Sequence, residues 1–309
     1  MKDYIIHIGL AKTASSFFQK TVFPRFQGLN YPGIAEVRSF VELNHLQLAD
    51  DSFYKPEKTK KLIDSFEGDK ILISDERLGG RFLGFGGVIN RSIIANRLKS
   101  LMPNARIMVF LRGQTSCIYS SYHQYIKGFT QGIKPFEEFI YQPQKYIDSD
   151  GKDPFYGSTS LGFSPHYVFY FELLKLYTSL FDEVKILLFE DFVHNPEKVL
   201  GEMEEFIKPS NSLAGKIVWE DRLNTPLIPS DLHYIRYANS TRYMGNKLLA
   251  KCFRKLIHTL NYGFSDALDA ELDAVKKLAP IFYSNNKLVT KYFPEAGIQQ
   301  YPQEYPTGK

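Results

Sequence analysis

Four short apolar runs recur along the first two thirds of the chain, separated by longer segments that mix polar and apolar residues. The runs are Tyr4–Ile8, Lys70–Ser74, Arg106–Leu111 and Val184–Phe189. The third run is apolar without alternation, which is typical of a strand covered on both faces, as in a parallel sheet. The pattern therefore predicts four strands that belong to a mostly parallel sheet.

Apolar positions at helical spacing lie between these runs. The predicted helices are Ser15–Val22, which Pro24 stops, Pro56–Phe66, Ile93–Leu101, Gln114–Lys127, one that ends near Phe181 and one that starts near Pro196. From about Leu223 to Phe293 the chain is predicted to be helical with no clear strand, and the tail from about 299 to 309 irregular. Strands that alternate with helices predict an α/β fold, with a parallel β-sheet flanked by helices and a helical C-terminal part. Since no linker, repeat or low-complexity block interrupts the chain, residues 1–309 are interpreted as a single domain.

Composition and charge narrow the class of protein. Hydrophobic residues make up 44% of the chain and charged residues 23%, which suits a globular protein with a sizeable core. The formal net charge of +4 is too small to favour nucleic acid as a partner. The two cysteines have neither disulfide-framework nor zinc spacing, and the N-terminal apolar run is too short for a signal peptide or a membrane span. We therefore expect a protein without a transmembrane segment in a reducing compartment. The simplest localisation is cytoplasmic, in a bacterium.

The strongest chemical signal follows the first strand, in the segment His7–Ser16. One lysine and three hydroxyl residues lie where this strand leads into a helix. Unpaired N–H groups and the dipole at a helix start attract anions, and Lys12 adds a full positive charge. An ordinary helix cap beside a surface lysine is the alternative interpretation. The segment lacks the spacer and the glycine before lysine of the Walker A motif.

This loop resembles the opening of the sulfotransferase family. In that family a PKxGTT-like loop holds the 5′-phosphosulfate of 3′-phosphoadenosine 5′-phosphosulfate (PAPS), and alanine stands here where the family usually has glycine. The resemblance implies a P-loop NTPase-like sulfotransferase fold, PAPS as donor and 3′-phosphoadenosine 5′-phosphate (PAP) as product. The residues that it places at the phosphosulfate are Lys12, Thr13, Ala14, Ser15 and Ser16.

The resemblance continues at the third strand. There the family has an arginine at the strand end and a serine eight positions later, both binding the 3′-phosphate; the matching residues are Arg112 and Ser120. Gly113 and Gln114 replace the family's usual Asp-Pro. The segment from Leu188 to Leu200 resembles a structural element of the family. Arg222 and Asn224 resemble a late family segment near the nucleotide. All these matches occur along the chain in the same order as in the family.

A general base is expected where the second strand ends. Glycan sulfotransferases have a Ser-x-Glu there whose glutamate acts as base, and Glu76 matches it. Because adjacent strand residues point to opposite faces, Asp75 is not expected to share its site. A solvated acid pair with Arg77 as salt-bridge partner is the alternative. His123 and His7 are rival bases, although a histidine in an apolar strand is more often a core residue.

Together these residues predict an enzyme that transfers the sulfuryl group from PAPS to a hydroxyl of a carbohydrate or glycolipid. Lys12 would offset charge on the leaving oxygen, so no metal is expected. The glycine-rich segment after Glu76 and residues 142–165 are candidates to frame the acceptor cleft, and the basic face of 247–258 is a candidate for peripheral membrane contact. A P-loop nucleotide kinase and a catalytically inactive nucleotide-binding protein remain the alternatives.

Overall fold

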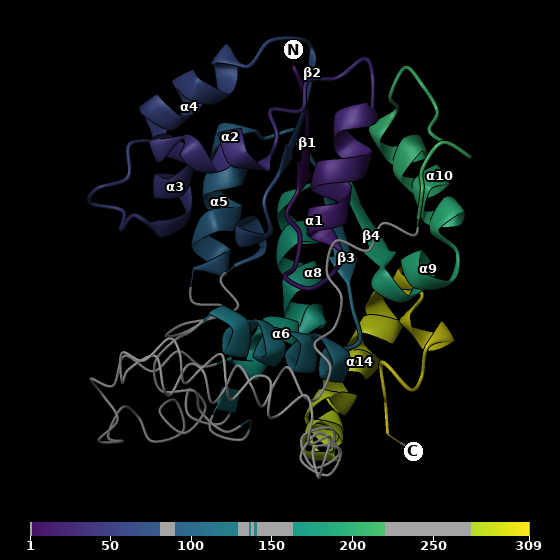
Figure 1. Cartoon of the computed structure of the whole chain (residues 1–309). Coiled ribbons are helices and arrows are strands. Elements are labelled where there is room, and N and C mark those ends of the chain that lie inside the picture. Colours follow the sequence, from purple (N-terminus) through teal and green to yellow (C-terminus); the bar gives the residue numbers. More distant parts are fainter. Residues whose placement is uncertain are drawn as a thin grey trace, which may run out of the picture.

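The computed structural model describes residues 2–80, 90–128, 136, 139–140, 163–219 and 273–308. A sheet of four parallel strands lies at its centre in the order β2-β1-β3-β4 (Figure 1). The strands are β1 (Asp3–His7), β2 (Lys70–Ser74), β3 (Arg106–Leu111) and β4 (Val184–Leu188). The four apolar runs thus form the four described strands, and the predicted α/β fold with a parallel sheet is confirmed.

Helices cover both faces of the sheet. The bounds of the α-helices are α1 (Ser15–Phe17), α2 (Ile34–Ser39), α3 (Val41–Leu48), α4 (Pro56–Ser65), α5 (Arg91–Leu101), α6 (Gln114–Gly128), α8 (Tyr170–Leu180), α9 (Phe189–His194), α10 (Pro196–Ile207) and α14 (Ala279–Tyr292). Figure 1 shows α3, α4 and α5 on one side of the sheet and α10 on the other. Three of these helices, α2, α3 and α9, have no counterpart in the sequence-based prediction.

Neighbouring residues of one strand belong to different hydrophobic clusters, one on each face of the sheet. Ile6 of β1 belongs to the larger hydrophobic cluster, which includes side chains of α3, α5, α8 and α14, whereas Ile5 belongs to the smaller cluster under α1 and α10. Both isoleucines are fully buried. Alternate residues of a strand point to opposite faces, so a strand covered by helices on both sides must be apolar throughout.

The first helix differs from its prediction. The segment Ser15–Val22 begins as α1, continues as a π-helical turn, η1 (Phe18–Val22), and extends as a 3₁₀ turn, η2 (Phe23–Arg25). Pro24 therefore does not stop the helical path but lies inside its last turn. Proline is tolerated in the first turn of a helix because the N–H it lacks would have no intrahelical partner there.

The C-terminal tail is ordered by burial rather than by regular hydrogen bonding. It contains the short 3₁₀ turns η5 (Pro294–Ala296) and η6 (Ile298–Gln300), and no helix or strand follows within residues 301–308. Tyr305 is nevertheless only 1% exposed. The tail predicted to be irregular from about 299 thus begins within η6 and has no regular element over 301–308, and the buried side chain of Tyr305 packs it into the core.

Several sequence-based expectations fall outside the described residues. They concern the acceptor loops at 81–89 and 142–162, the basic face of 247–258, and most of the helical region predicted from Leu223 onward. Within the described ranges α14 supports the helical C-terminal part. Across those same ranges, no helix has both the length and the apolar character that a membrane crossing demands.

Candidate functional site at the carboxyl edge of the sheet

Three loops that carry the predicted site residues leave neighbouring strands at the same edge of the sheet. Strand β1 lies between β2 and β3, so the loop after β1 has Glu76 on one side and Arg112 on the other. The chain passes from β1 to β2 and then back across to β3, which reverses the strand order between β1 and β3. Ligands of open parallel sheets bind outside the carboxyl ends of the strands at such a reversal.

The loop after β1, residues 8–14 and hereafter the β1 loop, has an unusual backbone. Gly9, Lys12 and Ala14 have positive φ values of 39°, 73° and 63°. Ala14 is in the left-handed region, where the family that the loop resembles usually has glycine. An L-residue costs about 1–2 kcal/mol in this conformation. The alanine therefore keeps the backbone shape of a glycine at an energetic cost.

The hydroxyl residues of the β1 loop have unequal positions. Thr13 is fully buried and its hydroxyl donates to the Leu10 carbonyl at 2.6 Å, and Ser15 contacts the same carbonyl at 3.3 Å. Ser16, in contrast, is half-buried. Thr13 and Ser15 thus hold the loop in its tight turn, and Ser16 is the more accessible of the three hydroxyls.

Arg112 joins β3 to the β1 loop. Its guanidinium donates to the Lys12 carbonyl at 2.7 Å and to the Ser116 hydroxyl at 3.1 Å, and it lies 4.3 Å from the centre of the Phe189 ring. Ser120 is half-buried one turn beyond Ser116 on α6. The family motif does not include Ser116. Its spacing of four residues from Ser120 could have indicated it, because residues four apart lie on one face of a helix. The two predicted anion-binding cations therefore come from segments that are in direct contact.

Gly113 is required by the tail that packs against it. A Cβ atom there would lie 2.4 Å from Glu304 Oε2 and 2.9 Å from its Cβ, so an aspartate, which the family usually has, would collide with an acidic side chain. The Gly113 N–H donates to the Glu190 carboxylate at 2.9 Å, and the same carboxylate accepts a hydrogen bond from the Tyr305 hydroxyl. Burial raises the pKa of Glu190, and these hydrogen bonds oppose the rise. The departure from Asp-Pro is thus explained by C-terminal residues.

Glu76 lies against the β1 loop. A Cβ atom on Gly9 would be 3.1 Å from the Glu76 Cα, so the loop approaches this residue as closely as a glycine allows. The Glu76 side chain is 25% exposed, and its Oε1 forms an ion pair with Arg38 at 2.6 Å. Gln19 donates to Oε2 at 3.4 Å. Neither Arg38 nor Gln19 was a sequence candidate; the only available signal was a glutamine that follows two phenylalanines in a predicted helix.

Asp75 is held differently, but not as separately as predicted. Its side chain is fully buried and pairs with Arg77, with Nη2 to Oδ2 at 2.6 Å. Arg38 also reaches Asp75 at 3.3 Å while it contacts Glu76. The expectation that the two acids do not share a site was therefore wrong for this arginine. Strand alternation no longer applies there, because β2 ends at Ser74 and Glu76 begins the 3₁₀ turn η3 (Glu76–Gly79).

The rival histidines have different environments. His7 is fully buried in β1, and its Nδ1 lies 2.7 Å from the Ser74 hydroxyl. Burial lowers the pKa of His7 to about 3, although the negative charge of Asp75 opposes this shift. His7 is therefore a neutral core residue at ordinary pH. His123 is half-buried on α6, and its ring centre lies 4.2 Å from that of Tyr119.

Two predicted nucleotide-binding residues, Arg222 and Asn224, lie outside the described residues.

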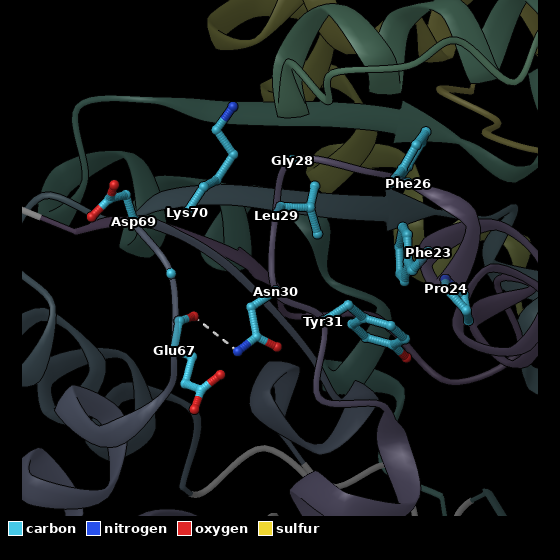
Figure 2. A pocket seen from close by; sticks show the side chains of 11 residues that line it. Phe23, Pro24, Phe26, Gly28, Leu29, Asn30, Tyr31, Glu67, Asp69 and Lys70 are labelled. Carbon is cyan, nitrogen blue, oxygen red and sulfur yellow. Dashed lines mark hydrogen bonds between the residues drawn. The ribbon is translucent and has the colours of Figure 1, made fainter.

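A cavity of about 630 Å³ lies at the other end of β2 (Figure 2). It is lined by Phe23, Pro24, Phe26, Gly28, Leu29, Asn30, Tyr31, Glu67, Gly68, Asp69 and Lys70. Lys70 begins β2 whereas Glu76 follows its end, so the cavity is separated from the candidate site by the length of the strand. As for metals, the part of the chain that the structure describes contains no group of three or more His, Cys, Asp or Glu residues suited to hold an ion.

The sequence matches no protein-family model. No curated protein matches it either. Among solved structures, the crystal structure of a sulfotransferase from Alicyclobacillus acidocaldarius matches with 16% identity and a TM-score of 0.48, covering 81% of this chain and 98% of that one.

Proposed function

We propose that the protein is a sulfotransferase that moves the sulfuryl group of PAPS to a hydroxyl of a carbohydrate or glycolipid. The observation that carries the proposal is the order of the site along the sheet edge. The β1 loop lies in the middle, Arg112 contacts it from the β3 side and Glu76 from the β2 side. An anion-binding loop between an arginine and a carboxylate suits a donor anion on one side and an acceptor hydroxyl on the other.

The side chains present fit a bisphosphorylated donor. Arg112 offers a planar fork that matches phosphate geometry, and Lys12 supplies a point charge on the β1 loop. Lys12 and Ala14 have positive φ with one residue between them, and backbone that alternates between the right- and left-handed regions presents N–H groups that suit an anion. The Ser116 hydroxyl accepts from Arg112, and Ser16 on α1 and Ser120 on α6 are further half-buried hydroxyls. In this proposal Arg112 and Ser120 bind the 3′-phosphate, and the β1 loop binds the 5′-phosphosulfate.

Glu76 is the proposed base. The donor supplies an activated sulfuryl group, and the chain must accept one proton from the attacking hydroxyl. Each of the two acids has an arginine partner, but the carboxylate of Glu76 is partly exposed beside the β1 loop, whereas that of Asp75 is fully buried. Lys12 would stabilise the negative charge that develops on the leaving oxygen. His123 stays the rival base, since α6 also carries Ser116 and Ser120.

Titration calorimetry tests the donor. We expect PAP to bind with higher affinity than ADP or ATP, because Arg112 has a phosphate partner only when the 3′-phosphate is present. Arg112→Ala should weaken PAP binding by about tenfold to a hundredfold, the loss of one charge-assisted contact of roughly 1.5–3 kcal/mol. Lys20→Ala is the matched control, because Lys20 is exposed on the turn after α1. Preference for ATP would favour the kinase, and equal binding of all three nucleotides would contradict the assignment of Arg112.

A radiolabelled-sulfate screen over glycans and glycolipids tests the reaction. Wild-type protein should label at least one acceptor that carries a free hydroxyl. Glu76→Gln should abolish transfer while PAP affinity stays unchanged, and Lys12→Ala should lower turnover. Normal turnover in Glu76→Gln would refute the base assignment. Tight PAP binding without transfer to any acceptor would instead favour the nucleotide-binding protein without activity.

A further inference from the structure

The carboxylate of Glu76 is held at both oxygens by residues from different elements. Arg38 of α2 contacts Oε1 at 2.6 Å, and Gln19 of η1 donates to Oε2 at 3.4 Å. Arg38 is 40% exposed, whereas Gln19 is only 5% exposed. The carboxylate is thus held from the solvent side by a charge and from the core side by a neutral amide.

Gln19 is itself fixed by a chain of buried hydrogen bonds. Its amide nitrogen also donates to the Ser74 hydroxyl at 3.1 Å, and that hydroxyl lies 2.7 Å from His7 Nδ1. An amide nitrogen only donates, so the Ser74 hydroxyl accepts from Gln19. The same hydroxyl, with one proton and a second lone pair, bonds to His7 Nδ1. The Ser74 hydroxyl is therefore held between Gln19 and the buried histidine of β1.

The backbone around Gln19 supports this placement. Gln19 belongs to the π-helical turn η1, and π turns are rare in proteins and frequent at functional sites. The Gln19 carbonyl accepts a hydrogen bond from the Tyr31 hydroxyl at 3.1 Å, which ties the turn to the following segment. Both ends of the residue are thereby immobilised.

We propose that Arg38 and Gln19 are positioning residues for Glu76, and that the hydrogen-bonded chain from His7 through Ser74 to Gln19 fixes the carboxylate beside the β1 loop. The proposal rests on the proposed function, in which Glu76 is the base. A base acts efficiently only when its oxygen is held within hydrogen-bond reach of the proton that it removes. Misplacement by about 1 Å can lower the rate about a hundredfold.

Gln19→Met tests the inner half of this arrangement. Methionine has a similar volume and adapts to core packing, but it donates no hydrogen bond. We expect kcat to fall about tenfold to a hundredfold, with PAP affinity unchanged within about twofold. Gln47→Met is the matched control, because Gln47 is equally buried and donates to Asp75 at the same 3.4 Å. Its kcat should stay within about twofold of wild type. Equal losses in both variants, or normal kcat in Gln19→Met, would overturn the proposal.

His7 separates positioning from packing. His7→Asn keeps an amide that can hydrogen-bond to Ser74, so kcat should stay within a few fold of wild type. His7→Leu removes the hydrogen-bond partner of Ser74 and should lower kcat as much as Gln19→Met does. If His7 serves packing alone, the apolar leucine suits the site between Phe23 and Phe110 at least as well as asparagine. A His7→Leu enzyme with normal kcat would therefore exclude the role of the chain.

A spectroscopic measurement keeps the inference testable apart from the proposed function. In ¹⁵N NMR of the full chain, the signals of the His7 ring nitrogens, assigned by their loss in His7→Asn, should shift in Gln19→Met and stay unchanged in Gln47→Met, because Ser74 links His7 to Gln19. Unchanged His7 signals in Gln19→Met would overturn the proposal whatever the enzyme does. Absence of sulfuryl transfer by wild-type protein would instead refute the proposed function, while the NMR result would still decide whether the chain couples His7 to Gln19.

Discussion

Replacing His7 with asparagine should make the folded protein less sensitive to acid. His7 is fully buried, and burial lowers its pKa from the ordinary value of 6.5 to about 3. Between these two values the unfolded chain binds a proton that the folded chain does not bind. Stability therefore falls as the pH decreases from 6.5 toward 3, and this contribution is fully present above pH 6.5.

The size of the effect follows from the span of this pH window. Each pH unit within it changes the free energy of unfolding by 1.36 kcal/mol, so lowering the pH to about 4 removes about 3 kcal/mol through His7 alone. Asparagine retains a hydrogen-bond partner for Ser74 and does not titrate. Carboxylates titrate in both proteins, and their contributions cancel when the two are compared.

Urea unfolding near pH 7 and near pH 4 measures the difference. Wild-type protein should lose about 3 kcal/mol more between the two conditions than His7→Asn does. His45→Asn is the control, because His45 is exposed on α3 and this variant should keep the acid sensitivity of wild type. The reasoning would be refuted if wild type and His7→Asn lost the same stability.

Three further predictions concern the β1 loop, the tail and the metal. Ala14→Gly should stabilise the fold by up to about 1 kcal/mol in urea unfolding, because Ala14 has a left-handed backbone, whereas Ala49→Gly, at an extended position, should destabilise it. Gly113→Ala should destabilise by about 1–3 kcal/mol, and a smaller loss in a Glu304→Gly background would identify the collision with Glu304; an equal loss would argue against it. Sulfuryl transfer should continue in EDTA, since Lys12 and Arg112 supply the charge; a strict Mg²⁺ requirement would contradict this role.

Local sequence patterns were sufficient for the framework of the sheet. Strands β2 and β3 have the predicted bounds, β1 is shifted by one residue at both ends, and β4 ends one residue earlier than predicted. Burial on two faces makes every position of a strand apolar, and this leaves a continuous signal in the sequence. The short helices α2, α3 and α9 left no comparable signal, because each is eight residues or fewer and lies directly beside another element.

The sequence by itself determined the chemistry available at the sheet edge: the lysine and hydroxyls of the β1 loop, the arginine after β3 and the acids after β2. Only the tertiary structure decided how these groups are arranged. It placed β1 between its two neighbours, brought Arg112 to the Lys12 carbonyl, and used Arg38 and Gln19 to hold Glu76. It also set Glu304 against Gly113, nearly two hundred residues away. The burial pattern of a strand or helix can be read from the hydrophobic spacing of neighbouring residues. Contacts between distant segments depend on strand order and packing, which no local pattern encodes.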